Sequence, residues 1–263
     1  MDGVSLILRL IVFTLGATVG SFLNVCIYRI PNKESIVKPR SRCGSCGRTL
    51  DPIDLVPILS WLFLRGKCRT CGAKISIRYP LVEALEGTLF LLVFSVYGLS
   101  FTTGLLFLFS ALMTVVFFID LDHMIIPNKV VLAGIGLGLL VGLVHRLVGY
   151  PLYGDVSMWA FVLGPVIPLI VMVLILVAST VFFKAGSLGM GDVKVYVPIG
   201  MFLGWRLALL SLWIAFLLGG VFGLFWIFGL RRDRKANIPF APFIAVGALV
   251  AALYGTPVLN YLF

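Results

Sequence analysis

The sequence predicts an all-α polytopic membrane protein, with about eight transmembrane helices and one small cysteine-bearing domain outside the membrane. Three observations predict this fold class. The 263 residues are 60% hydrophobic and only 12% charged, whereas about a quarter of a soluble domain is charged. Apolar runs long enough to cross a bilayer recur along the chain, and two CxxC motifs stand in its one long polar loop.

Eight apolar runs are the expected spans, because a helix that crosses a bilayer needs roughly 20 apolar residues. They lie near residues 4–24, 80–98, 101–119, 128–149, 157–183, 193–204, 206–230 and 239–262. The sixth run is too short to cross alone, so we expect it to tilt or to share an irregular turn at 200–204. The chain then divides into a first helix (1–24), a basic domain (25–78) and a seven-helix core (79–263).

The net charge of +10 is concentrated beside the expected spans. Of the 21 Lys and Arg residues, 11 lie between Arg29 and Arg78, and four more lie in RRDRK at 231–235. Such clusters orient a protein in the bilayer, so we expect lipid and no nucleic acid as partner. Alternating eight spans places both clusters on one side, which predicts that the loop faces the cytoplasm.

The loop contains CGSC at 43–46 and CRTC at 68–71, two motifs that 21 residues separate. A segment of about 50 residues buries little core, so it needs a further stabilising link. Four thiolates with this spacing predict a structural, tetrahedral Zn²⁺ site in a zinc-ribbon-like domain. Its ligands would be Cys43, Cys46, Cys68 and Cys71. Disulfides are the less favoured alternative, because cytoplasmic thiols stay reduced.

Two carboxylates stand at the expected cytoplasmic ends of spans. Asp120 ends one span in VVFFIDLDHMIIPNKVV, and Asp192 begins another in GMGDVKVYV. An ionisable group at membrane depth is costly, and it is a functional candidate by default. Two neighbouring carboxylates can share one proton, which provides a neutral acid and an ionised base. That combination activates water against a peptide carbonyl.

The residues around Asp192 agree with this role. Gly189 and Gly191 allow a tight turn and a close approach to a partner helix or an extended substrate strand. We expect Asp192 near the N-cap of its helix, whose dipole favours the ionised form, and Lys194 would act in the same direction. A purely structural cap is one alternative. A proton-coupled transporter is another, because transporters also place ionisable groups near helix breaks.

Six blocks of the sequence resemble the type IV prepilin leader peptidases, which are GxGD-type aspartic peptidases. The blocks are GSFLNVCIYRIP at 20–31, the paired CxxC motifs, LSWLFLRGKCRTC at 59–71, ISIRYPLVEALEG at 75–87, IDLDHMIIPN at 119–128 and GMGDVK at 189–194. The resemblance implies that Asp120 and Asp192 are the catalytic aspartates, with Asp122 as the alternative for the first.

The resemblance also implies two reactions at the bacterial inner membrane. The first cuts a prepilin or pseudopilin after the Gly that ends a short basic leader. The second transfers a methyl group from S-adenosylmethionine to the new amino terminus, and this cofactor is implied by the resemblance alone. Glu83 and Glu86 lie on one helix face and are candidates to contact the leader or the free amine. The alternative is a bridge from them to Arg78 or another loop cation.

Overall fold

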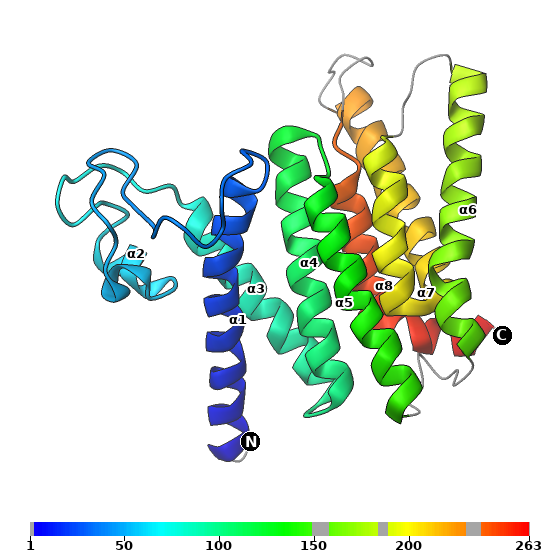
Figure 1. Ribbon diagram of the computed structural model, residues 1–263, viewed down its shortest axis with the longest axis horizontal. Helices are drawn as coiled ribbons and strands as arrows, with labels where there is room; N and C mark the ends of the chain where they lie inside the picture. Colours follow the sequence, from blue (N-terminus) through cyan, green and yellow to red (C-terminus); the bar gives the residue numbers. More distant parts are fainter. Residues whose placement is uncertain (1–2, 149–157, 184–188, 230–237, 263) are drawn as a thin grey trace. The chain divides into compact units, whose positions relative to one another are not determined.

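The computed structural model describes residues 3–148, 158–183, 189–229 and 238–262, and its regular elements are all helices (Figure 1). The only β pairing among these residues is two isolated bridges in the loop. The elements are α1 (Gly3–Arg29), η1 (Pro52–Leu55), α2 (Leu59–Phe63), α3 (Arg78–Tyr97), α4 (Phe101–His123), α5 (Asn128–Val148), α6 (Met158–Phe183), α7 (Met190–Leu224), η2 (Phe225–Gly229) and α8 (Ala241–Leu262). The basic cluster at 231–235 lies outside the described residues.

The helices confirm a multi-pass membrane protein. Five of them are long and apolar enough to cross a bilayer. These are Ser5–Arg29, Arg78–Tyr97, Phe101–His123, Phe161–Val181 and Met190–Gly229, while Asn128–Val144 and Ala241–Gly255 are shorter apolar stretches.

Helix α7 folds back on itself at Gly204, where the backbone leaves the helical region with φ +71° and ψ 166°. Asp192, near the beginning of α7, interacts electrostatically with Asp120, which is hydrogen-bonded to the first residue of α8. Gly219, near the end of α7, packs against Phe240, directly before α8. A straight helix would separate Asp192 and Gly219 by about 40 Å, so α7 makes two antiparallel passes. The expected spans 193–204 and 206–230 are these two passes.

Helix α1 extends further than its hydropathy indicated. The expected span ended at Asn24, whereas the helix continues to Arg29. The polar side chain of Asn24 is compatible with a buried helix because its Nδ2 donates a hydrogen bond to the Tyr79 carbonyl at 3.1 Å. A buried amide with a partner costs far less than one without.

The chain divides into two compact units, Met1–Val115 and Val116–Phe263. The division falls inside α4, whereas the sequence suggested domain boundaries after residues 24 and 78. In the first unit, α1 and α3 pack backbone against backbone at three glycines: a Cβ on Gly16, Gly20 or Gly87 would lie 2.8 Å from an atom of the other helix. Small residues permit this approach between membrane helices.

A Gly20→Ala substitution tests this packing. The added Cβ would lie 2.8 Å from the Glu83 Cα, a backbone atom that cannot move alone. Overpacking of this kind costs about 1–3 kcal/mol, so the variant should unfold at lower temperature in detergent. Gly104→Ala is the matched control, because nothing lies within 4 Å of the Cβ it would add. Equal melting temperatures for the two variants would contradict the close α1–α3 contact.

Candidate active site and metal centre

The second unit brings together the two carboxylates that the sequence singled out. Asp120 lies in the last turn of α4 and Asp192 in the first turn of α7. Both side chains are buried, with exposed fractions of 5% and 8%. The charge of Asp120 acts on Asp192, which places the two groups in one site. Residues 72 positions apart in the sequence therefore form a pair.

A backbone N–H group holds one oxygen of Asp120. Ala241, the first residue of α8, donates this hydrogen bond to Oδ2 over 3.0 Å. The N–H groups of a first helical turn have no partner inside the helix, and they carry the positive end of its dipole. Asp120 therefore ties the end of α4 to the beginning of α8. Sequence analysis missed this contact, because no local pattern relates residues 121 positions apart.

Asp192 is held in the same way by its own helix. The N–H of Gly189, the N-cap residue of α7, donates to Asp192 Oδ2 over 3.0 Å. This is the carboxylate half of a capping box, so the expectation of a position near the N-cap is confirmed. A Cβ on Gly189 would lie 3.2 Å from Asp192 Oδ2, and one on Gly191 would lie 3.1 Å from the Ile126 Cβ. The glycines thus make room for the cap and for a neighbouring segment.

Asp122 and Lys194, which lie two residues after Asp120 and Asp192, differ from them in their surroundings. Asp122, the alternative first aspartate, is exposed, whereas Asp120 is buried. Lys194 donates from Nζ to Asn128 Oδ1 over 3.4 Å and makes no ion pair with Asp192 among the described residues. Residues two apart on a helix do not face each other, which explains why the expected support from Lys194 is absent.

Tyr196 is a further residue of this site that sequence analysis missed. It lies one helical turn after Asp192, is fully buried, and interacts electrostatically with Asp192. Its hydroxyl interacts with the side chain of Ser211. The spacing i, i+4 from the aspartate was the available signal. A hydroxyl has one donor and two acceptor sites, so it can also bond a water or substrate oxygen held at the carboxylates.

Glu83 and Glu86 are engaged within the first unit. The Ile58 N–H donates to Glu83 Oε2 over 2.7 Å. Glu86, which is fully buried, accepts hydrogen bonds from the hydroxyls of Ser110 at 2.8 Å and Thr114 at 2.6 Å. The bridge from either glutamate to Arg78 or another loop cation stays a prediction. Backbone and hydroxyl donors bond both glutamates, and contact with a substrate also stays a prediction.

The four loop cysteines converge as their spacing predicted. Their sulfur atoms lie within 4.8 Å of one another. Each CxxC forms a knuckle that a short antiparallel bridge closes, Arg42 with Thr49 and Lys67 with Lys74. At the same place in each knuckle, Gly47 and Gly72 adopt φ +70° and +68°, values that favour glycine. The local chain therefore shapes two equivalent halves of one site.

This donor set fits a tetrahedral metal ion. Metal–sulfur bonds of about 2.3 Å place tetrahedral sulfurs about 3.8 Å apart, and Cys43 Sγ lies 3.8 Å from Cys71 Sγ. All the cysteines are free thiols, so the disulfide alternative is not realised. The four residues would hold the ion, and the ion would join the two knuckles without leaving a position for catalysis.

Local hydrogen bonds and desolvation give the cysteine thiols different pKa values. Backbone N–H groups of Cys46 and Ser45 lower the pKa of the Cys43 thiol to about 6. The N–H of Ala73 lowers the pKa of Cys71, but desolvation and the neighbouring thiols outweigh it and raise that pKa to about 11. Metals bind the thiolate, so loading the site at neutral pH displaces a proton from Cys71.

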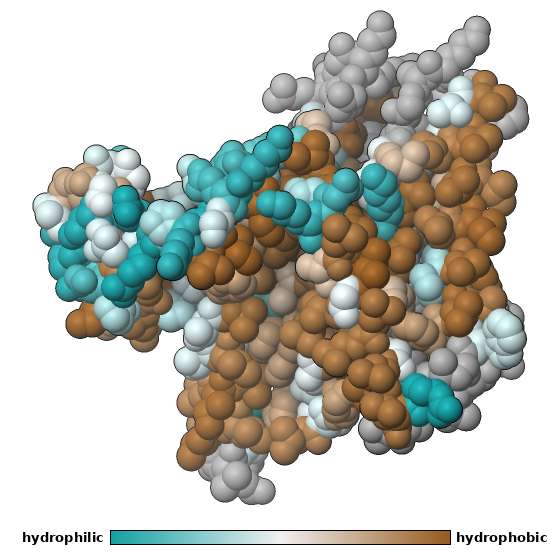
Figure 2. All heavy atoms as spheres, viewed as in Figure 1, coloured by the Kyte–Doolittle hydropathy of each residue, from teal (hydrophilic) through white to brown (hydrophobic). Residues whose placement is uncertain are grey.

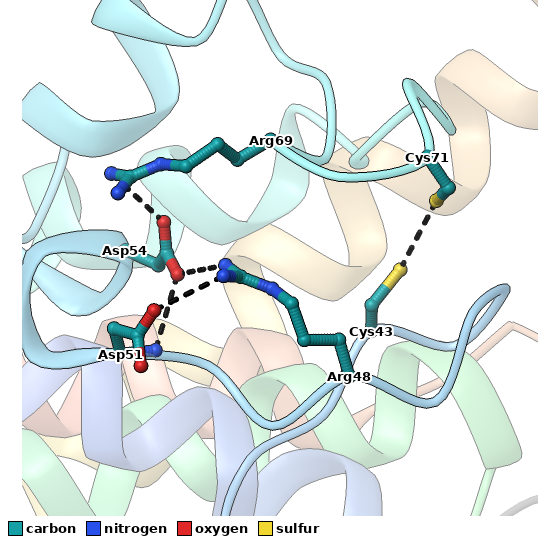
Figure 3. Close-up of polar contacts among 6 residues, drawn as sticks. All are labelled: Cys43, Arg48, Asp51, Asp54, Arg69 and Cys71. Atoms are coloured by element: carbon teal, nitrogen blue, oxygen red, sulfur yellow. Dashed lines mark hydrogen bonds and ion pairs between the residues drawn. The ribbon is translucent and has the colours of Figure 1, made fainter.

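An ion-pair clasp, formed by Asp54 with Arg48 and Arg69, joins the two knuckles beside the cysteines (Figure 3). Arg48 follows the first CxxC and Arg69 lies inside the second. Asp54 Oδ2 pairs with Arg48, and Oδ1 lies 3.1 Å from Arg69 Nη2. The Asp54 side chain is only 5% exposed, so its charge depends on both arginines. Sequence analysis assigned no role to Asp54.

An Asp54→Asn substitution should weaken metal retention by about 10–100-fold, because residues that orient metal ligands have effects of this size. The measurement is competition for the ion with a chelator of known affinity. Asp51→Asn is the matched control: Asp51 also pairs with Arg48, at 3.0 Å, but its side chain is 60% exposed. Surface pairs contribute little. Equal metal affinity of the two variants would contradict a clasp centred on Asp54.

Comparisons with known proteins agree with this geometry. Residues 14–97 match the Bacterial Peptidase A24 N-terminal domain, and residues 107–224 match the Type IV leader peptidase family. The Bacillus subtilis (strain 168) protein "Prepilin leader peptidase/N-methyltransferase" is 32% identical over 252 residues, 95% of this chain and 96% of its own length. No solved structure matches the chain.

Two further relatives carry the same name. The Myxococcus xanthus (strain DK1622) protein is 37% identical over 84% of this chain, and the match spans 63% of that longer relative. The Aeromonas salmonicida (strain A449) protein is 30% identical over 95% of this chain and 92% of its own length. The first family match covers the paired cysteines, and the second covers the paired aspartates. The chain belongs to the type IV leader peptidase family.

Proposed function

We propose that the chain is an aspartic endopeptidase of the bacterial inner membrane, which removes the short basic leader of prepilins or pseudopilins after Gly. Family membership and the names of the curated relatives support the reaction class. The observation that supports it most directly is the buried pair of Asp120 and Asp192 at the ends of two spans. By the alternation of spans, the pair and the cysteine loop would lie on the cytoplasmic side, where a basic leader begins.

In this proposal one carboxylate acts as the general base of peptide hydrolysis and the other as the general acid. Each has one oxygen fixed by a backbone N–H, from Ala241 or Gly189, and its second oxygen makes no hydrogen bond within the described residues. One carboxylate takes a proton from water, whose oxygen attacks the scissile carbonyl. The other gives a proton to the carbonyl oxygen, and the amine then leaves with a proton. Fixed carboxylates need little rearrangement during the reaction.

We also propose that the chain methylates the new amino terminus, since the relatives' name pairs the two activities. S-adenosylmethionine would supply the methyl group. Glu83 and Glu86 are the candidates to contact the amine, but their hydrogen bonds to the backbone and to Ser110 and Thr114 would first have to exchange. No step is therefore assigned to them.

The ion at the four cysteines is, in this proposal, structural Zn²⁺. Thiolate ligands select zinc over magnesium or calcium, and four of them fill a tetrahedral shell. The loop has little core of its own, so the ion would stabilise its fold. Catalysis is assigned to the aspartates alone.

Substitution of single aspartates tests the catalytic pair. Asp120→Asn and Asp192→Asn each remove a proton-transfer group while keeping its shape, so prepilin cleavage should fall by at least about 100-fold. Asp122→Asn should retain cleavage, because Asp122 is exposed. The measurement is the product mass after incubation with a prepilin peptide. Cleavage retained by both buried-site variants would overturn the proposal and leave the transporter alternative to be tested by flux.

Chelation tests the division of roles between ion and carboxylates. A chelator added to the folded, lipid-reconstituted enzyme should leave the initial rate of cleavage unchanged while the loop becomes more sensitive to protease. A loop that is equally resistant without its ion would contradict the structural role of zinc. Immediate loss of cleavage, with the loop still intact, would contradict a metal-free reaction at the aspartates.

A further inference from the structure

An exposed apolar surface lies in the otherwise basic loop. Residues 55–64, LVPILSWLFL, contain no charge, and most of their large side chains face outward. We call the exposed members, together with Ile53, the α2 face: Ile53, Leu55, Val56, Leu59, Leu62 and Phe63. Phe63 is 82% exposed. In Figure 2 hydrophobic atoms gather along the lower edge of this loop, below its hydrophilic atoms.

Two contacts fix this segment, one to the spanning helix α3 and one within the loop. The Ile58 N–H donates to Glu83 of α3 over 2.7 Å, and Trp61 Nε1 donates to the Ile75 carbonyl over 3.1 Å. Ile58 has φ +61°, a costly conformation for a β-branched residue, so its surroundings must impose it. The α2 face is therefore fixed in position by its contacts. Trp61 points inward, whereas Phe63 points outward.

The bond to Glu83 also sets the depth of the segment. Glu83 lies five residues into α3, counted from Arg78, which is about 7.5 Å along the helix. An amphipathic helix at a membrane surface buries its apolar side about 5–10 Å into the boundary between headgroups and acyl chains. In Figure 1, α2 lies no higher than the beginning of α3. Entry of α3 into the bilayer at Arg78 would place the α2 face at the depth of this boundary.

The charges around the α2 face identify its partner. Arg65 and Lys67 follow α2 directly and are exposed. The acidic residues nearest in sequence are neutralised, because Asp51 and Asp54 pair with Arg48, and Asp54 also pairs with Arg69. Arg65 and Lys67 form no ion pair with any residue that the structure describes. An apolar surface with such basic neighbours fits anionic phospholipid, where each basic residue adds about 1 kcal/mol of attraction.

We propose that the α2 face is a lipid-docking surface, which inserts into the anionic leaflet on the side of the loop. Docking would hold the cysteine knuckles at the membrane surface. This inference uses the spans and the loop alone, so it does not depend on the proposed peptidase activity.

Photocrosslinking of the full chain in liposomes tests the partner. A benzophenone amino acid replaces Phe63, and the liposomes contain phosphatidylglycerol with a detectable tag. The matched control carries the same probe at Thr70, which is exposed in the second knuckle. The expected result is a tagged lipid adduct from position 63 and none from position 70. A crosslinked dimer from position 63, or no adduct from either position, would overturn the proposal.

A second variant covers the case in which the probe disturbs folding. Phe63→Asp places a charge at the lipid boundary, so it should release the segment and speed trypsin cleavage after Arg65 severalfold in phosphatidylglycerol liposomes. Metal content per chain, measured in the same sample, reports that the knuckles are still formed. Cleavage as slow as in the unchanged protein, with full metal content, would show that the α2 face has no lipid contact.

Discussion

The hydrogen bond from the Ala241 N–H to Asp120 joins the end of α4 to the beginning of α8, and the account of the site depends on it. Asp192 uses the N–H of Gly189 in the same way at the beginning of α7. Two helix termini therefore each bind one buried carboxylate through the donors that a first turn leaves unpaired. The reversal of α7 at Gly204 brings its second pass back to the same end as Asp192. Fold and site are thus set by the same backbone groups.

The sequence predicted most of what depends on local composition. Spans follow from hydropathy, and the cysteine cluster follows from CxxC, because each knuckle forms within a few residues. The position of Asp192 near an N-cap was also predicted, since Gly189 and Asp192 are three residues apart. Each of these features lies within one short stretch of sequence, so a single motif contains all the residues that form it.

The remaining features are long-range, and no motif contains them. Ala241 as the partner of Asp120, the clasp centred on Asp54 and the bond from Ile58 to Glu83 all join separate segments. The glycines of GMGD were interpreted as room for a partner helix or for a substrate. Gly191 lies against Ile126 of its own unit, and the approach of a substrate stays a prediction. The exposed α2 face escaped notice because an apolar run in a sequence looks the same whether it is buried in protein or in lipid.

The central claim is that Asp120 and Asp192 together direct water at a peptide bond. The most direct measurement is cleavage of a prepilin by the purified, lipid-reconstituted protein in water enriched in oxygen-18. The account predicts a released leader whose new carboxyl group contains one heavy oxygen, and no release by either Asp→Asn variant. A prepilin that stays intact, or a leader released equally by both variants, would contradict it.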